Sequence, residues 1–469
     1  MKHKGYKITK ASTHASRKAR IQANKPDAGF VRIQQQVIHL LDGMISAQSA
    51  PNLLLAFSGG VDSCVLLHAL VQAKKTLHFN LQAMHVHHGL SPNADDWADF
   101  CAKTCADYQV PLDIVQVKVA KAAGLGIEAA AREARYQALL SKGADFIVLA
   151  HHQDDQAETL LLQLLRGAGL KGLSAMATQD AGRGLLRPLL DTTRLAIEAY
   201  AKAAELRWIE DESNRDIAYD RNYCRHEIMP IIKARFPAAA ATLARSASHL
   251  AEAADLLDEL AQIDAQTCVF DGRINIASLS ALSLPRAKNL FRWWLSAMHF
   301  SAPSKDRLDE MLAQLINASG DASLKILLDK ANNTYLRRYQ GDAYIETHHP
   351  DQVSEIAMVW QGEESLTMPD GTVLLFERQL GQGLALDRLG GHKLRIAHRH
   401  GGERFKPDLA RPTRTLKHLL QEAKMPPWLR ERLPLVYLDD TLAVVPNIGV
   451  DCMMQANAQE TGLLIRWLV

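Results

Sequence analysis

An apolar run that breaks into a glycine pair constrains this chain more than any other feature. The segment from Leu53 to Phe57 is apolar throughout, and Ser58-Gly59-Gly60-Val61-Asp62-Ser63 follows it directly. The apolar, helix-periodic segment 65–71 comes next, so the pattern predicts a strand, a loop and the start of a helix. Because glycine has no Cβ, backbone N–H groups can converge on anionic oxygens at that helix N-terminus. The loop therefore predicts a phosphate site.

The polar side chains of this loop indicate a nucleotide with a divalent cation. Ser58 and Ser63 supply hydroxyl donors, and Asp62 would repel phosphate unless it holds a cation, so a nucleotide with Mg²⁺ is the expected ligand. No lysine follows the glycines, so this is not the G-x-x-x-x-G-K-[ST] loop. The pattern resembles the pyrophosphate loop (PP-loop) of the N-type ATP pyrophosphatases, which split ATP into AMP and pyrophosphate. An ordinary strand-turn-helix corner is the alternative.

Length and composition indicate a globular protein of several domains. A chain of 469 residues suggests about three domains. Of these residues, 47% are apolar and 23% are charged, which is typical of globular proteins. No apolar segment approaches the roughly 20 residues that a membrane-spanning helix needs. The basic tail, residues 1–30, lacks the apolar core of a secretory signal. We expect a cytoplasmic protein with no membrane partner.

Cysteine spacing argues against a zinc knuckle and a disulfide framework. The six cysteines include no C-x-x-C pair. Cys101 and Cys105 are four residues apart in a predicted helix, and we expect both to be packing residues.

Positive charge is concentrated in two places although the net charge is only +2. One is the basic tail, and the other is the stretch 392–418, which contains Arg404 and Lys417. Two basic patches on a nearly neutral chain predict a polyanionic partner such as RNA. A solvated charged face is the alternative, and for the tail simple disorder is equally consistent.

Strand-like and helix-periodic segments alternate in the first half of the chain. The predicted strands are 53–57, 81–86, 114–119 and 146–150, and the predicted helices include 128–141 and 156–166. This alternation predicts an α/β fold with a doubly wound parallel sheet, whose ligands bind at the carboxyl ends of the strands. We expect this catalytic domain at 31–229, a helical domain with a strand pair at 230–350, and a small α+β domain at 355–469.

Two polar motifs follow predicted strands. His85, His87 and His88 end the second strand, where strand alternation separates them, so a polar loop in the nucleotide crevice is favoured over a metal site. Asp155 and Glu158 follow the fourth strand and are spaced to share one side of a helical turn, which suits an ammonium ion or a metal. Capping of the helix by Asp154 is the alternative.

Glu128, Arg132 and Arg135 share one face of the predicted helix 128–141. From spacing alone, an ordinary salt-bridged surface helix explains them.

These motifs, in their order along the chain, resemble the bacterial tRNA(Ile)-lysidine synthetases. The segments that carry the resemblance are 58–63, 87–90 with 94–97, 128–136, 151–159, 166–170 with 172–173, 187–190, and 210–214 leading to Arg221-Asn222. The segments 401–404, 416–417 and 426–430 resemble the C-terminal domain of that family's longer, three-domain form. The basic tail extends beyond typical members.

The resemblance implies a reaction and its participants. ATP adenylates the C2 oxygen of the wobble cytidine in a tRNA(Ile) with a CAU anticodon, and the ε-amine of free L-lysine then displaces AMP to form lysidine. A homodimer is left open. Two other functions also remain open: a PP-loop tRNA thiolase, which should carry cysteine pairs, and a non-catalytic RNA-binding protein, which would not need an intact loop.

The resemblance also implies a role for each matching residue. Asp62 positions Mg²⁺ or the activated nucleotide, and Asp155 with Glu158 holds the lysine. His151 and Arg132 line the same crevice. The remaining implied contacts are Ser58, Gly59, Gly60, Val61 and Ser63 on the phosphates of ATP, and Arg221, Arg225, Arg404, Lys417 and Arg430 on the RNA.

Overall fold

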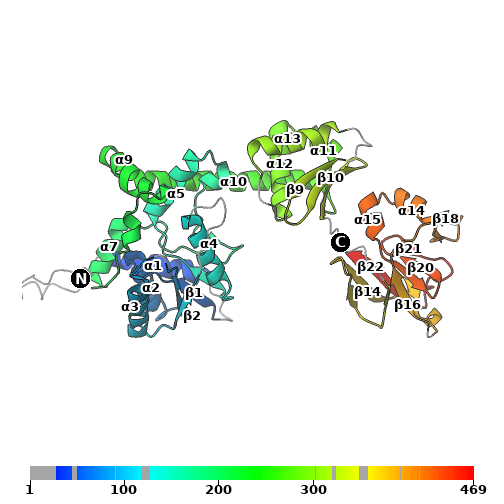
Figure 1. Cartoon of the computed structure of the whole chain (residues 1–469), viewed down its shortest axis with the longest axis horizontal. Coiled ribbons are helices and arrows are strands. Elements are labelled where there is room, and N and C mark those ends of the chain that lie inside the picture. Colours follow the sequence, from blue (N-terminus) through cyan, green and yellow to red (C-terminus); the bar gives the residue numbers. More distant parts are fainter. Residues whose placement is uncertain are drawn as a thin grey trace, which may run out of the picture. The chain divides into compact units, whose positions relative to one another are not determined.

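The computed structural model describes residues 28–44, 50–89, 91–117, 127–300, 303–318, 324–347, 357–390, 392–410 and 412–468. The chain divides into two compact units, one ending at Leu257 and the other beginning at Asp258 (Figure 1). The basic tail up to residue 27 lies outside the described residues.

The first unit is built on the parallel sheet that the sequence predicts. Its strands are β1 (Asn52–Ala56), β2 (Asn80–His87), β3 (Leu112–Gln116), β4 (Phe146–Val148), β5 (Gln179–Asp180) and β6 (Leu185–Leu186), in the spatial order β3-β2-β1-β4-β6-β5. All neighbours pair in parallel except β5 with β6. The four predicted strands are confirmed, with ends that shift by a few residues.

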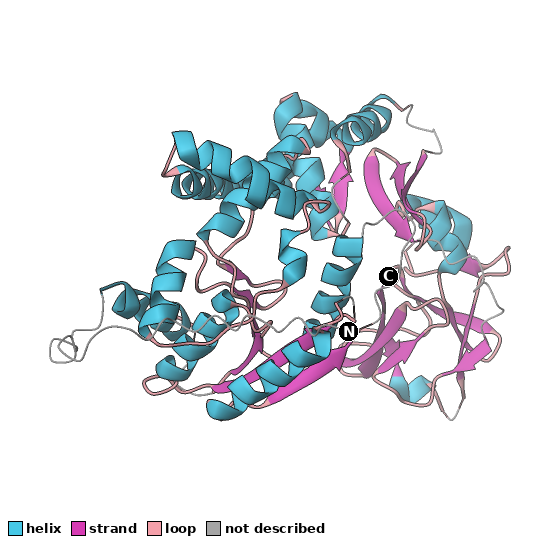
Figure 2. Cartoon of the chain, turned by 60° about the vertical axis from the view of Figure 1, so that its left-hand side comes forward, coloured by secondary structure: helices cyan, strands magenta, loops and turns pink. Residues whose placement is uncertain are grey.

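Helices pack on this sheet (Figure 2). Successive side chains of a strand point to opposite faces of its sheet, and Leu53, Leu54 and Leu55 of β1 are all buried, so both faces must be covered. The helices are α1 (Ala28–Asp42), α2 (Val61–Ala73), α3 (Ala94–Asp107), α4 (Ile127–Leu140), α5 (Gln153–Leu165), α6 (Leu170–Leu173) and α7 (Arg194–Ala203). Leu53 and Leu55 join the core formed with α1, α2, α3 and α7, whereas Leu54 packs with Leu139 of α4. The sheet is therefore doubly wound. Cys101 and Cys105 are buried in the first of these cores, as predicted.

A mostly helical stretch follows the sheet. It contains a 3₁₀ turn (Glu212–Arg215), α8 (Asp220–Tyr223), a π-helical turn (Cys224–Ile228), α9 (Met229–Arg235) and α10 (Ala239–Cys268). Short π-helical turns occur frequently at functional sites because they re-aim side chains within a helix. Here the turn carries Arg225.

The region after α10 differs from the prediction. Helices α11 (Ile276–Ala281), α12 (Leu284–Ala297) and α13 (Lys305–Asn317) are present, but the expected strand pair is a five-stranded antiparallel sheet. Its strands, in spatial order, are β7 (Val269–Phe270), β8 (Arg273–Asn275), β11 (Asp342–Thr347), β10 (Thr334–Tyr339) and β9 (Lys325–Asp329). Two- and three-residue strands such as β7 and β8 have too few positions to show a period of two, so the sequence pattern could not reveal them.

The C-terminal region is α+β, as predicted. One sheet contains β12 (Ala357–Val359), β16 (Leu394–Ala397), β19 (Leu435–Leu438), β20 (Thr441–Val445) and β21 (Gly449–Val450). Another contains β13 (Ser365–Thr367), β14 (Val373–Leu380), β22 (Thr461–Leu468) and β15 (Leu384–Ala385), and β17 (Arg404–Phe405) pairs with β18 (Arg414–Thr415). The helices are α14 (Leu416–Glu422) and α15 (Pro427–Arg432). Within the described residues, no helix has the length and apolar character that crossing a membrane demands.

Candidate active site

The glycine loop lies between β1 and α2 and is held by a few short contacts. Gly59 has φ = +82°, which favours glycine. Its carbonyl accepts from the Ile209 N–H at 2.9 Å, and the Ser63 hydroxyl donates to the Gly60 carbonyl at 2.9 Å. Gly60 is the N-cap of α2, so the free N–H groups of the first turn face the loop. The predicted strand, loop and helix are confirmed.

We expect Gly59→Ala to distort this loop. A Cβ at this position would lie 2.9 Å from Ile209 Cδ1 and 3.1 Å from Cys101 Sγ. The clash and the positive φ together should cost about 1–3 kcal/mol of folding free energy. Chemical denaturation of the variant and ATP titration by calorimetry measure both effects. Gly143→Ala is the matched control, because it also has positive φ (+64°) but open space at the Cβ position; an equal loss of ATP affinity in both variants would contradict the role of the clash.

Asp62 sits at the start of α2 and is bound by an arginine that the sequence did not single out. Arg194, the first residue of α7, donates from Nη1 to both Asp62 oxygens at 2.7 and 2.8 Å. The Nε2 atom of His152 lies 3.7 Å from Asp62 Oδ1. Burial raises the pKa of Asp62 above its usual value, although the charges of His152 and Arg194 oppose this shift.

The two carboxylates of α5 lie together, as their spacing predicts. Arg225 Nη2 donates to Asp155 Oδ1 at 2.9 Å and to Glu158 Oε2 at 2.8 Å, and its Nε donates to Glu158 Oε1 at 2.7 Å. Arg221 also bridges both acids, at 2.9 and 3.3 Å. Burial alone would raise the pKa of Asp155, but the charges of His152 and Arg221 lower it well below its usual range. Asp155 is therefore held ionised, and Arg221 and Arg225 bridge it to Glu158.

The two histidines after β4 have different environments. His152 is buried and caps α5, and its backbone N–H donates to Asp155 Oδ2 at 3.0 Å. The capping alternative based on Asp154 is wrong, because Asp154 lies within the helix and binds Lys233. Burial lowers the pKa of His151 well below its usual value, so this ring is neutral at physiological pH.

A cavity of about 560 Å³ connects the glycine loop with these acids. The candidate residues that line it are Ser58, Gly60, Val61, Asp62, Asp155, Glu158 and Arg225, with His152, Arg194 and Lys233 as residues that the sequence prediction missed. His152 belongs to the segment 151–159, which carries part of the family resemblance, whereas Arg194 and Lys233 belong to no local motif. His151, Arg132 and Arg221 are not among the lining residues.

The histidines at the end of β2 do not gather into a metal site. His85 Nδ1 contacts the Phe57 carbonyl at 3.0 Å, and His87 Nε2 lies 3.1 Å from Asp95. Among the described residues, no group of three or more His, Cys, Asp or Glu side chains could hold a metal ion.

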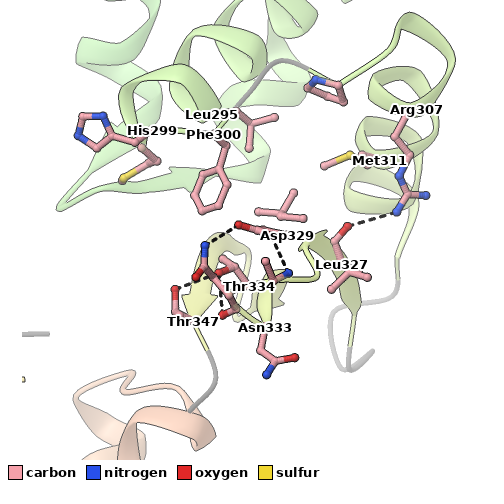
Figure 3. Close-up of a pocket in the computed structure, with 15 residues that line it drawn as sticks. Leu295, His299, Phe300, Arg307, Met311, Leu327, Asp329, Asn333, Thr334 and Thr347 are labelled. Atoms are coloured by element: carbon pink, nitrogen blue, oxygen red, sulfur yellow. Dashed lines mark hydrogen bonds between the residues drawn. The ribbon is translucent and has the colours of Figure 1, made fainter. Parts of the chain in front are cut away.

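A cavity of about 860 Å³ in the second unit lacks comparable chemistry. It is lined by apolar side chains such as Leu295, Phe300 and Met311, and by the β9–β10 turn, where Asp329 accepts from Asn332 at 2.7 Å (Figure 3). The Asp329 carboxylate already has a hydrogen-bond donor within its own turn. Although this cavity is larger than the one beside the glycine loop, it therefore does not mark the active site.

The residues predicted to meet RNA in the terminal region differ in exposure. Arg404 and Lys417 are exposed. Arg430 is only 9% exposed and donates from Nε to the Met425 carbonyl at 2.7 Å, so it is engaged in the fold.

Three known protein families match successive segments of this chain. They are a PP-loop domain at residues 31–232, a TilS substrate binding domain at 274–344 and a TilS substrate C-terminal domain at 394–467. Among solved structures, a U34-tRNA thiolase from Methanococcus maripaludis aligns with a TM-score of 0.41 at 18% identity, covering 48% of this chain and 79% of that chain. A likeness of this size supports no argument about function.

Full-length relatives are much more similar. The tRNA(Ile)-lysidine synthase of Nitrosomonas europaea is 43% identical over 90% of this chain and 93% of its own length. The corresponding synthase of Azoarcus sp. is 44% identical over 89% of this chain and 92% of its own length, and that of Coxiella burnetii is 38% identical over 90% and 94%. With this identity along nearly the whole chain, and with the PP-loop and the paired acids in one cavity, the chain belongs to the tRNA(Ile)-lysidine synthase family.

Proposed function

We propose that this enzyme joins free L-lysine to C2 of the wobble cytidine in a tRNA(Ile) with a CAU anticodon, using ATP and releasing AMP and pyrophosphate. One observation carries the proposal: His152 Nε2 lies 3.7 Å from the loop carboxylate Asp62 and 3.4 Å from Asp155. A phosphate-binding loop and a site for a cationic amine therefore share one cavity. Because its proposed substrate is a tRNA, we expect the enzyme to act in the cytoplasm.

The residues present fit Mg²⁺ as a companion of ATP. Mg²⁺ typically takes one or two carboxylates and completes its shell with phosphate oxygens and water. Asp62 supplies such a carboxylate beside the loop, and Arg194 would have to release it. When bound, Mg²⁺ would neutralise charge on the phosphates.

The chain's own groups then act in two steps. The cytidine O2 attacks the α-phosphorus of ATP, and the bond to pyrophosphate breaks; the N–H groups of the loop and α2 stabilise the charge of the departing pyrophosphate. The ε-amine next attacks C2, the C2–O bond breaks, AMP leaves with the oxygen, and the amine loses a proton. Asp155 and Glu158 bind and orient the lysine for this attack.

The decisive experiment supplies the protein with ATP, Mg²⁺, labelled lysine and unmodified CAU-anticodon tRNA(Ile). We expect lysidine in the digested RNA, identified by mass, with one AMP released for each lysidine. AMP release without incorporation of lysine would overturn lysine as the nucleophile, and absence of both products would overturn the proposal.

We expect Arg404→Ala with Lys417→Ala to reduce the salt dependence of tRNA binding. Each phosphate contact releases about 0.7–0.9 counterions, so loss of two contacts should make the slope of log K against log[salt] shallower by between about one and two. Filter binding from low to moderate salt measures this slope. Arg378→Ala, an exposed change in β14 outside the 392–418 stretch, serves as the control; an unchanged slope in the double variant would place the phosphate contacts elsewhere.

A further inference from the structure

Arg194 occupies the carboxylate that the proposed reaction assigns to Mg²⁺. Its Nη1 atom donates to both oxygens of Asp62, at 2.8 and 2.7 Å. Its side chain lines the same cavity as Ser58 and Gly60 of the glycine loop. Mg²⁺ needs direct access to a carboxylate oxygen and repels a guanidinium placed on that carboxylate. Arg194 and Mg²⁺ therefore compete for Asp62.

The position of Arg194 in α7 is a poor one for the stability of that helix. Arg194 is its first residue, directly after the N-cap Thr193. A positive charge in the first turn opposes the helix dipole, and the first turn of α7, all of whose residues the structure describes, contains no acidic residue to offset it. The ion pair with Glu198 runs from a basic to an acidic residue, the weaker of the two orders along a helix. The role of Arg194 therefore lies outside its helix, at the glycine loop.

The backbone of Arg194 is fixed, whereas its side chain can change partners. The Arg194 N–H donates to Asp154 Oδ2 at 3.2 Å, and the same carboxylate binds Lys233 of α9. The Arg194 Nε donates to Glu198 Oε1 at 2.9 Å, and these two side chains are 41% and 37% exposed. An ion pair this exposed contributes little to stability. The guanidinium can therefore turn to another acceptor without disturbing the core.

Other basic side chains around the cavity have partners away from the loop. Arg225 donates to both acids of α5, and Lys233 pairs with Asp154. The side chain of Arg215 is 80% exposed, and its carboxylate partner lies 3.6 Å from it. Among the arginine and lysine side chains that the structure describes around this cavity, Arg194 is thus the one whose partner Mg²⁺ would take.

An exchange of partners keeps every charge neutralised. If Mg²⁺ takes Asp62, the guanidinium of Arg194 loses its carboxylate, and an unpaired charge in a partly buried site is costly. The same binding event brings phosphate oxygens, which accept two-point hydrogen bonds from arginine. We propose that Arg194 covers Asp62 in the free protein and moves to the pyrophosphate portion of ATP when the nucleotide binds, so that Asp62 takes Mg²⁺ only together with ATP. This inference rests on the use of ATP with Mg²⁺ proposed above.

The exchange orders the binding of ATP and Mg²⁺. A divalent cation alone meets a carboxylate that is already paired, so it binds weakly. Phosphate draws the guanidinium away and leaves the carboxylate open, so the nucleotide and the cation bind together. Once moved, Arg194 also stabilises the charge that develops on pyrophosphate as its bond to the α-phosphorus breaks. One arginine thus serves both the binding of ATP and the first chemical step.

Affinities for parts of the nucleotide test the phosphate contact. In the wild type, breaking the pair with Asp62 offsets part of this contact, so the comparison is between Asp62→Asn and the double variant Asp62→Asn with Arg194→Met. We would titrate each full-length protein by calorimetry with ATP, pyrophosphate and AMP in the presence of Mg²⁺. We expect the loss of Arg194 to weaken ATP and pyrophosphate about 10- to 100-fold, the effect of losing a hydrogen bond between charged groups, and to leave AMP within about twofold. Unchanged binding of pyrophosphate would overturn the proposal.

Metal binding without nucleotide tests whether Arg194 covers Asp62. Mn²⁺ shares the preference of Mg²⁺ for carboxylate oxygens, and electron paramagnetic resonance measures its free fraction. We expect Arg194→Met to bind Mn²⁺ about tenfold more tightly than the wild type, because a nearby positive charge is removed, and we expect the double variant to lose this gain. Equal affinity of the wild type and Arg194→Met would contradict the covering of Asp62. A gain that persists in the double variant would place the ion on another carboxylate and contradict it equally.

Two further variants complete the test. Arg194→Lys replaces Arg194→Met if that variant fails to fold; it keeps the charge but not the planar two-point contact, so we expect a smaller change in the same direction. Lys202→Met, an exposed change at the other end of α7, should alter none of these affinities. The titrations contain neither lysine nor tRNA, so they do not depend on which nucleophile the enzyme uses. Failure of the proposed reaction appears instead as absence of lysidine in the assay described above.

Discussion

Asp62→Asn should lower the rate of lysidine formation by about a thousandfold while leaving tRNA affinity unchanged. The substitution keeps the shape of the side chain but removes the charge that both Mg²⁺ and Arg194 require. The present carboxylate accepts two hydrogen bonds from Arg194 Nη1, at 2.7 and 2.8 Å, so its charge also orders the start of α7. Single-turnover kinetics with saturating ATP and labelled lysine measure the chemical step directly.

Asp107→Asn provides the matched control for this change. Asp107 is an exposed residue at the end of α3, so its loss of charge should leave the rate within about twofold. Filter binding of tRNA to each variant separates binding from chemistry. A rate for Asp62→Asn within tenfold of the wild type would show that the loop carboxylate is dispensable, and a parallel loss of tRNA binding would assign it to RNA instead.

The sequence predicts those parts of the site that have a short, local sequence pattern. A glycine pair after an apolar strand specifies the loop, and i, i+3 spacing places Asp155 and Glu158 on the same turn. The meeting of these motifs follows from parallel strand topology, because the carboxyl ends of β1 and β4 share one edge of the sheet.

The parts that sequence could not predict depend on long-range packing. Arg194 reaches Asp62 across 132 positions of sequence, and Arg225 reaches Glu158 across 67. No periodicity encodes such a pair. The resemblance placed Arg221 and Arg225 near RNA, whereas their guanidiniums lie on the acids of α5; contact with RNA remains a prediction. The same limit applies to the middle sheet, whose strands β7 and β8 are too short to show alternation.

The paired acids and arginines also have a structural role that can be separated from chemistry. Glu158→Ala should destabilise the region around α5 by about 3 kcal/mol, because it leaves two partly buried guanidiniums with Asp155 as their one shared carboxylate. The Glu158 side chain is 3% exposed, and those of Arg221 and Arg225 are 22% and 32% exposed, so the penalty is smaller than for a fully buried pair. Hydrogen exchange of the α5 amides measures this loss locally, which suits a chain of two units.

The double variant Glu158→Leu with Arg225→Met tests the same cluster without leaving a charge unpaired. Asp155 then keeps Arg221 at 2.9 Å as a single partner, and apolar side chains of similar volume replace the other pair. Because such replacements are often neutral for stability, we expect protection of α5 to return close to the wild-type level. Lysidine formation should be abolished in this variant, since no apolar residue can accept a hydrogen bond from an ammonium group. Recovery of activity along with stability would mean that Glu158 serves the fold alone, and that Asp155 by itself binds the amine.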